Sequence, residues 1–241
     1  MLKKLLLEID NQPIFYSYFK YKGYSKQLLY NYVKSGWLEK VSTGIYKKKG
    51  AELGPLNILE AVYLQLGLKF HIGAQSALYL LKIIHYLKFK EKYIIFIYPG
   101  MRINPWLKSL DFFYFIRKGL LNEENIGLRM EDNVLISSIE RALIEMAALV
   151  PKEASMEELY EIIKLLPNID IKLLQNILVL CRSIKAKRVF LFLAEKVSHK
   201  WFGKLEVEKI DLGKGVRQII KNGVFYKKYN IVASKEFLND F

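Results

Sequence analysis

The sequence is poor in the residues on which metal sites, disulfides and much catalysis depend. Its 241 residues include one cysteine, Cys181, and three histidines, His71, His85 and His199, which are far apart in the chain. A single cysteine excludes an intrachain disulfide and a cysteine-based zinc site. The histidines lack metal-ligand spacing, and no catalytic triad or nucleotide-binding fingerprint accompanies them. We therefore expect no metal, no cofactor and no catalysis, and we expect Cys181 to be a small core residue.

Long apolar runs are also missing. No run approaches the roughly 18 residues that a membrane-spanning helix needs. The first residues, "MLKKLLLEIDNQP", begin with basic charge as a signal peptide does, but the apolar stretch is short and Glu8 and Asp10 follow it. This pattern favours an amphipathic helix of the mature protein. We expect a cytoplasmic protein that does not bind membranes.

Acidic residues are outnumbered by basic ones, 24 to 38, so the net charge is +14. Such a surplus favours nucleic acid or an acidic membrane surface as a partner. Only seven of the basic residues are arginines, however, and Lys, Ile, Tyr and Phe are all abundant, so a genomic composition bias would produce a similar surplus. The distribution of the charge favours a binding surface, because residues 1–50 hold ten lysines against three acidic residues.

The N-terminal part, residues 1–54, has the order of elements of a winged helix-turn-helix. Apolar spacing predicts three short helices, over residues 1–9, 13–23 and 25–36. The third begins at the N-cap Ser25 and ends at Gly36. Two short strands follow, at 37–41 and 44–48, joined by a turn at Ser42-Thr43-Gly44. We predict a winged helix-turn-helix domain over residues 1–54.

The third helix of this domain has one apolar and one polar face. Leu28, Leu29, Tyr32 and Val33 are expected to face the core. On the other face, Gln and Asn side chains can pair bidentately with adenine, and lysines can reach guanine or phosphate. A solvated surface is the alternative for any one of these residues. The predicted DNA contacts are Ser25, Lys26, Gln27, Tyr30, Asn31 and Lys34 on the helix, and Lys40, Ser42, Thr43, Tyr46, Lys47, Lys48 and Lys49 on the wing.

The rest of the chain, residues 55–241, is predicted to form a larger mixed α/β domain, with a sub-division near residue 137 left open. Helices are predicted at 55–67, 74–84, 138–149, 156–166, 171–182 and 186–199. Strands are predicted at 93–99, 111–118 and 204–213, with hairpins at 126–137 and 216–232. Asp132-Asn133 and Asn222-Gly223 are the expected turns of the two hairpins. The fold class is therefore α+β.

Basic residues also gather in the C-terminal half. A cluster of Arg182, Lys185, Lys187 and Arg188 lies where the helix predicted at 171–182 ends and the helix predicted at 186–199 begins. Lys214 and Arg217 would join this cluster if the tail of the chain folds back. We predict a basic patch that engages RNA, nucleotide or DNA; ordinary placement of charge at helix ends is the alternative. Arg141 and Glu145, one helical turn apart, are expected to form a structural pair. The residues of the predicted patch are Arg182, Lys185, Lys187, Arg188, Lys214 and Arg217.

Several segments resemble one known family. The segment "YVKSGWLEKVSTGIYKKKG" resembles the N-terminal winged helix of the AbiE-type antitoxins of bacterial type IV toxin–antitoxin systems. Other segments are similar to blocks of that family's C-terminal antitoxin domain, and "FHIGAQSALYLL" also fits. These blocks are "SSIERALIEM", "LLQNILVLCRSIKAKRVFLFLAE", "HKWFGKL" and "DLGKGVRQIIKNGVFYKKYNI".

The resemblance implies two activities. The winged helix would bind inverted repeats in double-stranded operator DNA and repress its own operon. The C-terminal domain would counter the effect of a nucleotidyltransferase toxin without a stable complex with it. Two other functions stay open: a ligand-responsive winged-helix transcription factor, which predicts a sizeable apolar pocket, and an accessory protein of an enzyme or nuclease, which predicts acidic or histidine residues in a cleft. The oligomeric state is also left open.

Overall fold

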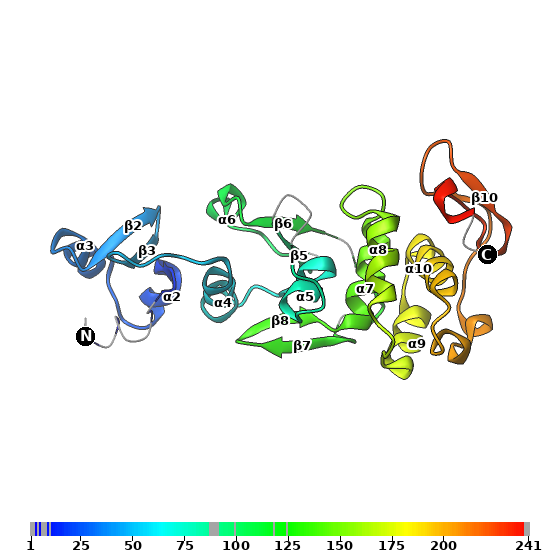
Figure 1. Cartoon of the computed structure of the whole chain (residues 1–241). Helices are drawn as coiled ribbons and strands as arrows, with labels where there is room; N and C mark the ends of the chain where they lie inside the picture. The colour runs from blue at the N-terminus through cyan, green and yellow to red at the C-terminus, as the bar shows by residue number, and fades with distance from the viewer. Residues whose placement is uncertain are drawn as a thin grey trace. The chain divides into compact units, whose positions relative to one another are not determined.

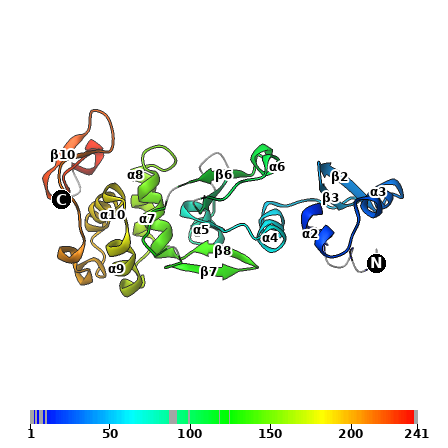
Figure 2. The ribbon, with the colours of Figure 1, turned by 180° about the vertical axis from the view of Figure 1, so that it is seen from behind.

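The computed structural model describes residues 3, 5, 9, 11–86, 92–98, 100–117, 119–123 and 125–238. They form helices and three small sheets (Figure 1, and from behind in Figure 2), which confirms the α+β class. The chain divides into two compact units. The predicted domain boundary after residue 54 stays a prediction. Unit 1 comprises residues 1–70, 100–113 and 130–135, and unit 2 comprises 71–99, 114–129 and 136–241.

The first part of unit 1 contains two short helices and a three-stranded sheet. Strand β3 lies in the centre and is antiparallel to both neighbours. The helix predicted from Pro13 begins only at Tyr16, because Ile14 and Phe15 pair with Tyr46 and Ile45 as an added strand. The elements are β1 (Ile14–Phe15), α2 (Tyr16–Tyr21), α3 (Lys26–Lys34), β2 (Leu38–Ser42) and β3 (Ile45–Lys48).

A small core joins these elements. Phe19 and Tyr24 meet edge to face, with ring centroids 5.5 Å apart. Of the helix predicted over residues 1–9, the structure describes Lys3, Leu5 and Ile9 as helical, and the rest lies outside the described residues. The buried members of this core are Leu5, Ile9, Ile14, Phe19, Tyr24, Leu29, Leu38 and Tyr46.

Helix α4 (Pro55–Leu66) forms where the sequence predicts a helix, and it belongs to unit 1. It begins at a proline and ends at Gly67, whose φ of 60° is left-handed. Gln65 links α4 to β1: its Oε1 accepts from the Phe15 amide at 3.0 Å, and its Nε2 donates to the Pro13 carbonyl at 2.8 Å. The short helix α6 (Pro105–Ser109) carries Trp106, whose ring meets that of Phe15.

A five-stranded sheet has the order β6-β5-β4-β8-β7. The predicted hairpin is confirmed, and its turn residues Asp132 and Asn133 have φ values of 43° and 61°. Helix α5 (Ala74–Leu80) is shorter than predicted, since Lys82 takes a left-handed φ of 59°. Pro99 and Lys118, at the ends of two predicted strands, lie outside the described residues. The strands are β4 (Phe70–Ile72), β5 (Tyr93–Ile97), β6 (Phe113–Ile116), β7 (Leu128–Glu131) and β8 (Val134–Ser137).

Four helices form the main body of unit 2, where they lie side by side in both views (Figures 1 and 2). Each begins at a side chain that accepts a backbone N–H near the helix start, as N-caps do. Ten of the 11 residues of the first helix and ten of the 14 residues of the last are buried. Cys181 lies in this core, and burial raises the pKa of its thiol. The helices are α7 (Ile139–Leu149), α8 (Met156–Lys164), α9 (Ile171–Leu180) and α10 (Ile184–Val197).

The tail of unit 2 differs from the prediction. The strand predicted at 204–213 is wrong: Leu205 and Ile210 are buried beside two turns of 3-10 helix, η1 (Phe202–Lys204) and η2 (Val207–Lys209). The hairpin predicted around Asn222-Gly223 is also wrong. Strand β10 (Val224–Tyr226) pairs antiparallel with β11 (Ile231–Ala233), after the 3-10 turn η3 (Lys227–Tyr229), and β11 pairs parallel with β9 (Arg217–Gln218). The last described element is η4 (Lys235–Leu238).

Candidate functional site

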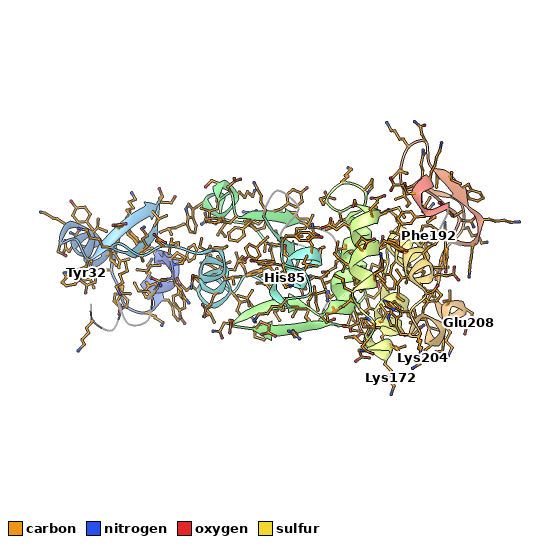
Figure 3. The ribbon with its side chains drawn as sticks, viewed as in Figure 1. Tyr32, His85, Lys172, Phe192, Lys204 and Glu208 are labelled. Carbon is orange, nitrogen blue, oxygen red and sulfur yellow. The ribbon has the colours of Figure 1, made fainter. Side chains whose placement is uncertain are left out.

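Helix α3 has the two faces that the sequence predicts. Leu29 is fully buried, and Leu28, Tyr32 (labelled in Figure 3) and Val33 pack partly buried against the core. Ser25 caps the helix, because its hydroxyl accepts from the Leu28 amide at 3.0 Å. The exposed residues of this segment are Ser25, Lys26, Gln27, Tyr30, Asn31 and Lys34.

Two amide side chains on this exposed face bind each other. Gln27 Nε2 donates to Asn31 Oδ1 at 3.1 Å, one helical turn away. The pair holds both amides in a defined orientation while their remaining donor and acceptor positions face outward. A helix surface that presents oriented amides beside lysines can make bidentate hydrogen bonds to a planar polar partner.

Part of the positive charge predicted for the hairpin β2–β3 is paired within it. Lys47 Nζ lies 3.2 Å from a Glu39 carboxylate oxygen and donates to the Ala51 carbonyl at 2.9 Å. The hydrogen bonds from Lys47 and from the Gly50 amide lower the pKa of Glu39, so this carboxylate stays charged. Lys40, Thr43 and Lys49 are exposed, and Ser42 and Lys48 are half-buried.

Tyr46, a predicted wing contact, belongs to the core instead. Its exposed fraction is 7%, and it pairs with Ile14 on one side and Lys40 on the other in the centre of the sheet. The added strand β1 is the reason, because it makes β3 a central strand rather than one edge of a two-stranded wing.

The basic cluster of unit 2 is divided between surface and interior. Arg188 is 1% exposed and Lys187 is 2% exposed, so these two members of the predicted patch lie in the interior and not on the surface. The guanidinium of Arg188 binds the tail: Nε donates to the Leu212 carbonyl at 2.7 Å, Nη2 donates to Gly213 at 3.0 Å, and Nη1 donates to Gly215 and Asn230 at 2.6 and 3.0 Å. Burial, and then the charge of Arg217, lower the pKa of Arg188.

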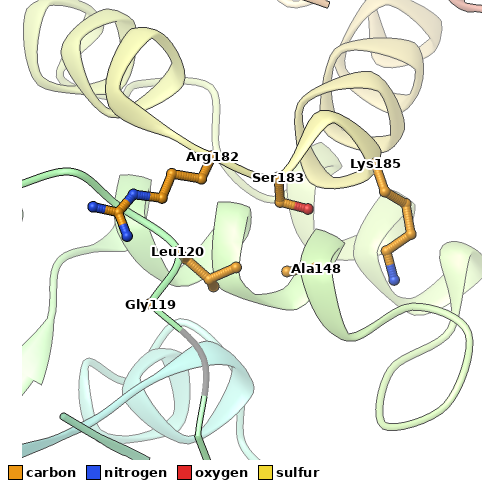
Figure 4. Close-up of a pocket in the computed structure, with 6 residues that line it drawn as sticks. All are labelled: Gly119, Leu120, Ala148, Arg182, Ser183 and Lys185. Atoms are coloured by element: carbon orange, nitrogen blue, oxygen red, sulfur yellow. The ribbon is translucent and has the colours of Figure 1, made fainter. Parts of the chain in front are cut away.

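The other members of the predicted patch lie at the surface or in a pocket. Arg182, Ser183 and Lys185 line a pocket of about 310 Å³ with Gly119, Leu120 and Ala148 (Figure 4). Arg182 donates to the Asn122 amide oxygen, and Lys185 donates to the Val150 carbonyl. Lys214 and Arg217 are exposed on the loop and strand that Arg188 anchors. The pocket and the anchored loop are therefore separate features of unit 2.

Unit 2 also contains a buried ionic network that spacing in the sequence does not reveal. Glu145, 2% exposed, accepts at Oε1 from Arg141 Nε and His71 Nε2, each at 2.8 Å. Its Oε2 accepts from Ser137 Oγ at 2.7 Å and from the Ala74 amide at 3.0 Å. The pair Arg141–Glu145 is structural, as predicted, but it is the centre of a core network.

The network is closely packed. The His71 ring stacks on Phe96 at 5.1 Å, and a Cβ at Gly73 would lie 2.3 Å from Glu145 Oε2. Burial would raise the pKa of Glu145, but His71 and Arg141 outweigh it and lower this pKa to about 2. Burial lowers the pKa of His71, against the opposing effect of Glu145. The charged Glu145 carboxylate is therefore held in the core between Arg141 and His71, which both bind its Oε1.

In the described part of the chain, no three His, Cys, Asp or Glu residues gather as a metal site would require. None of the helices in this part is both long and apolar enough to cross a membrane.

Comparison with known proteins shows the family. A family model described as "Transcriptional regulator, AbiEi antitoxin N-terminal domain" matches residues 2–89, and one described as "Transcriptional regulator, AbiEi antitoxin, Type IV TA system" matches residues 90–234. The fold is similar to the crystal structure of the RV2827C protein from Mycobacterium tuberculosis, with a TM-score of 0.69 at 14% identity over 95% of this chain and 89% of that chain. No curated protein matches the chain.

The two matches together cover nearly the whole sequence, so the protein is a transcriptional regulator of the toxin–antitoxin class. It belongs to the AbiEi antitoxin family of type IV systems.

Proposed function

We propose that the protein represses its own operon by binding inverted repeats in the operator through α3 and the β2–β3 hairpin. The observation that carries this proposal is the exposed face of α3, where the paired amides of Gln27 and Asn31 lie between Lys26 and Lys34. Amides of this kind pair bidentately with adenine in the major groove, and lysines bind phosphate or guanine. Lys40, Lys48 and Lys49 of the hairpin supply contacts to the adjacent backbone, whereas Tyr46 and Lys47 do not.

We propose that the C-terminal part counters the effect of a nucleotidyltransferase toxin by binding rather than by catalysis, and without a stable complex with the toxin. The family supports the role, and the pocket with Arg182 and Lys185 supports an anionic ligand. Arg188 and Lys187 are excluded from direct contact because they are buried.

A gel shift on the DNA upstream of the protein's own coding region tests the operator proposal. We expect the double variant Gln27→Ala/Asn31→Ala to lose discrimination between operator and random DNA, at about 1–3 kcal/mol for each bidentate amide–adenine pair that is removed. The control pair Asn176→Ala/Gln218→Ala removes exposed amides from unit 2 and should bind like the wild type. Equal discrimination by both double variants would refute the assignment of α3.

The wing is tested by the salt dependence of the same binding. We expect Lys48→Gln/Lys49→Gln to weaken binding to all sequences and to reduce the slope of log K against log salt by about 0.9 for each phosphate that the variant leaves unneutralised. Lys200→Gln/Lys204→Gln removes the same charge from exposed positions of unit 2 (Lys204 is labelled in Figure 3) and is the matched control.

Growth rescue during co-expression with the toxin tests the antitoxin role. We expect Arg182→Gln/Lys185→Gln to keep operator binding but to lose rescue, because only the pocket is changed. Full rescue by a stably folded double variant would show that this pocket takes no part in neutralisation.

A further inference from the structure

A second pocket of unit 2 lies between α10 and the C-terminal strands and has a volume of about 350 Å³. Phe192 and Glu195 of α10 form one wall, and the run from Phe225 to Tyr229 forms the other. The ring of Phe192, labelled in Figure 3, lies 4.6 Å from the ring of Tyr226. The Tyr226 hydroxyl donates to the Ser234 carbonyl at 2.8 Å, so this aromatic wall is fixed in place.

The rim of the pocket is aromatic and cationic. Phe225 is 48% exposed, which is unusual for a phenylalanine that lines a pocket. Lys227 and Lys228 are exposed beside it, and Lys228 forms an ion pair with Glu195 whose side chain is 25% exposed. An exposed aromatic ring beside lysines is the combination with which proteins bind unpaired nucleotides, since bases stack on the ring and phosphates meet the cations.

The pocket also holds a buried hydroxyl beside a carboxylate. Tyr229 is 3% exposed, and its hydroxyl lies next to Glu195. Burial, and then the charge of the Glu195 carboxylate and its hydrogen bonding, raise the pKa of Tyr229, so the hydroxyl keeps its proton. Glu195 therefore interacts with both Tyr229 and Lys228 at this wall of the pocket.

We infer that this pocket binds a nucleotide, with the base against Phe225 and the phosphate at Lys227 and Lys228. The Glu195 carboxylate is then an acceptor for N–H or O–H groups of the nucleotide. The volume lies at the lower end of the range of small-ligand pockets. The inference does not rest on operator binding, because none of these residues belongs to α3 or its hairpin. The nucleotide comes either from a free nucleoside triphosphate or from a single-stranded RNA.

The test uses the full chain with ATP, GTP, CTP and UTP singly, a fluorescein-labelled single-stranded RNA of ten nucleotides, and a duplex RNA of the same sequence. We expect Phe225→Ala to weaken binding of the triphosphate or of the single strand by at least about fivefold, as the loss of one stacked base does. Phe112→Ala removes another exposed phenylalanine and is the matched control. Circular dichroism shows that the variants are folded.

Two more variants sharpen the result. Phe225→Trp should keep affinity, and its fluorescence should be quenched by the stacked base. Lys227→Gln/Lys228→Gln should weaken the same ligand, whereas Lys200→Gln/Lys204→Gln should not.

The outcomes separate the sources and the alternatives. Loss confined to the triphosphates assigns the pocket to a free nucleotide, and loss confined to the single strand assigns it to RNA. Equal affinities of Phe225→Ala and Phe112→Ala for every probe would overturn the inference. Binding of a polyglutamate peptide that depends on Lys228 but not on Phe225 would also overturn it, in favour of an acidic protein partner.

Discussion

Glu145 is the residue at which a single substitution tests the electrostatic description of unit 2. Its carboxylate accepts hydrogen bonds from His71, Arg141, Ser137 and the Ala74 amide. In Glu145→Gln the side chain keeps its size but loses its charge. Its NH₂ group, which can only donate, then replaces one carboxylate oxygen that accepts hydrogen bonds from the surrounding donors. Arg141 then stays buried without its counter-ion, which is the costly way to break a buried pair.

The magnitude follows from the pKa. The carboxyl titrates at about 2 in the folded protein against 4.5 in the reference state. At about 1.36 kcal/mol per pKa unit, the charged form gains roughly 3 kcal/mol from its surroundings. This agrees with the roughly 3–5 kcal/mol that removing one partner of a buried ion pair usually costs. We expect Glu145→Gln to lower the free energy of unfolding of unit 2 by about 3 kcal/mol at pH 7.

Urea unfolding followed by circular dichroism measures the loss. With a slope of about 3 kcal/mol per molar urea, the midpoint should fall by about 1 M. Glu208→Gln, an exposed carboxylate of the same unit (labelled in Figure 3), should leave the midpoint unchanged. A midpoint for Glu145→Gln equal to that of this control, with the same slope, would refute the reasoning.

The pH dependence has a defined sign. The folded-state pKa of Glu145 lies below the reference value of 4.5, so the unfolded chain takes up the proton first as the pH falls. The stability that Glu145 contributes is therefore present above pH 4.5 and is lost as the pH falls toward 2. The difference between wild type and Glu145→Gln should be full at about pH 7 and should shrink below pH 4.5. A difference that stays constant across this range would contradict the linkage.

Two other predictions concern the tail. Arg188→Met should release residues 211–233, because four backbone carbonyls lose their charged donor. We expect the free energy of opening this segment to fall by about 3 kcal/mol, so that amide hydrogen exchange of β9 and β11 becomes about 100-fold faster. Arg182→Met is the control and should leave the exchange rate unchanged. Gly223→Ala should destabilise the tail by about 1–3 kcal/mol, because its Cβ would lie 2.3 Å from the Ala233 carbonyl oxygen. Gly203→Ala, where nothing lies within 4 Å, is the control, and equal melting temperatures for the two glycine variants would contradict this predicted clash.

The sequence predicts best those elements whose signals are local. Helix α3 is confirmed because a cap at Ser25, an apolar stripe and Gly36 with a φ of 76° all act within a dozen residues. The turn at Asp132 and Asn133 is predictable for the same reason, since both residues tolerate a left-handed backbone.

Errors arise where a distant partner decides the structure. The sequence predicts a helix at Ile14 and Phe15, but in the structure they form a strand that pairs with β3, about thirty residues later. No residue near them indicates this pairing. The sequence predicts Gly223 as a turn residue. In the structure, a side chain at this position would clash with the Ala233 carbonyl of β11, so only glycine fits. Neither partner leaves a signal in the local pattern.

The candidate site shows the same limit. The exposed residues of α3 follow from helical spacing, whereas the burial of Tyr46 follows only from the added strand. The network around Glu145 joins residues 74 positions apart, and no spacing rule connects them.

The burial of Arg188 changes how any loss of antitoxin activity in this cluster has to be interpreted. Sequence alone makes Arg182, Lys185, Lys187 and Arg188 equivalent members of one basic run. In the structure, Arg188 fixes the carbonyls of the loop that leads to β9 and β11, and the pocket proposed for a nucleotide is formed by the tail that these strands hold. A substitution at Arg188 would therefore lower the proposed antitoxin activity by displacing the tail, even if Arg188 never meets a ligand. Only the exposed or pocket-lining members can report on binding. If Arg188→Lys, which keeps the charge but not the planar set of donors, is as inactive as Arg188→Met while Arg182→Lys remains active, the role of Arg188 is to hold the tail.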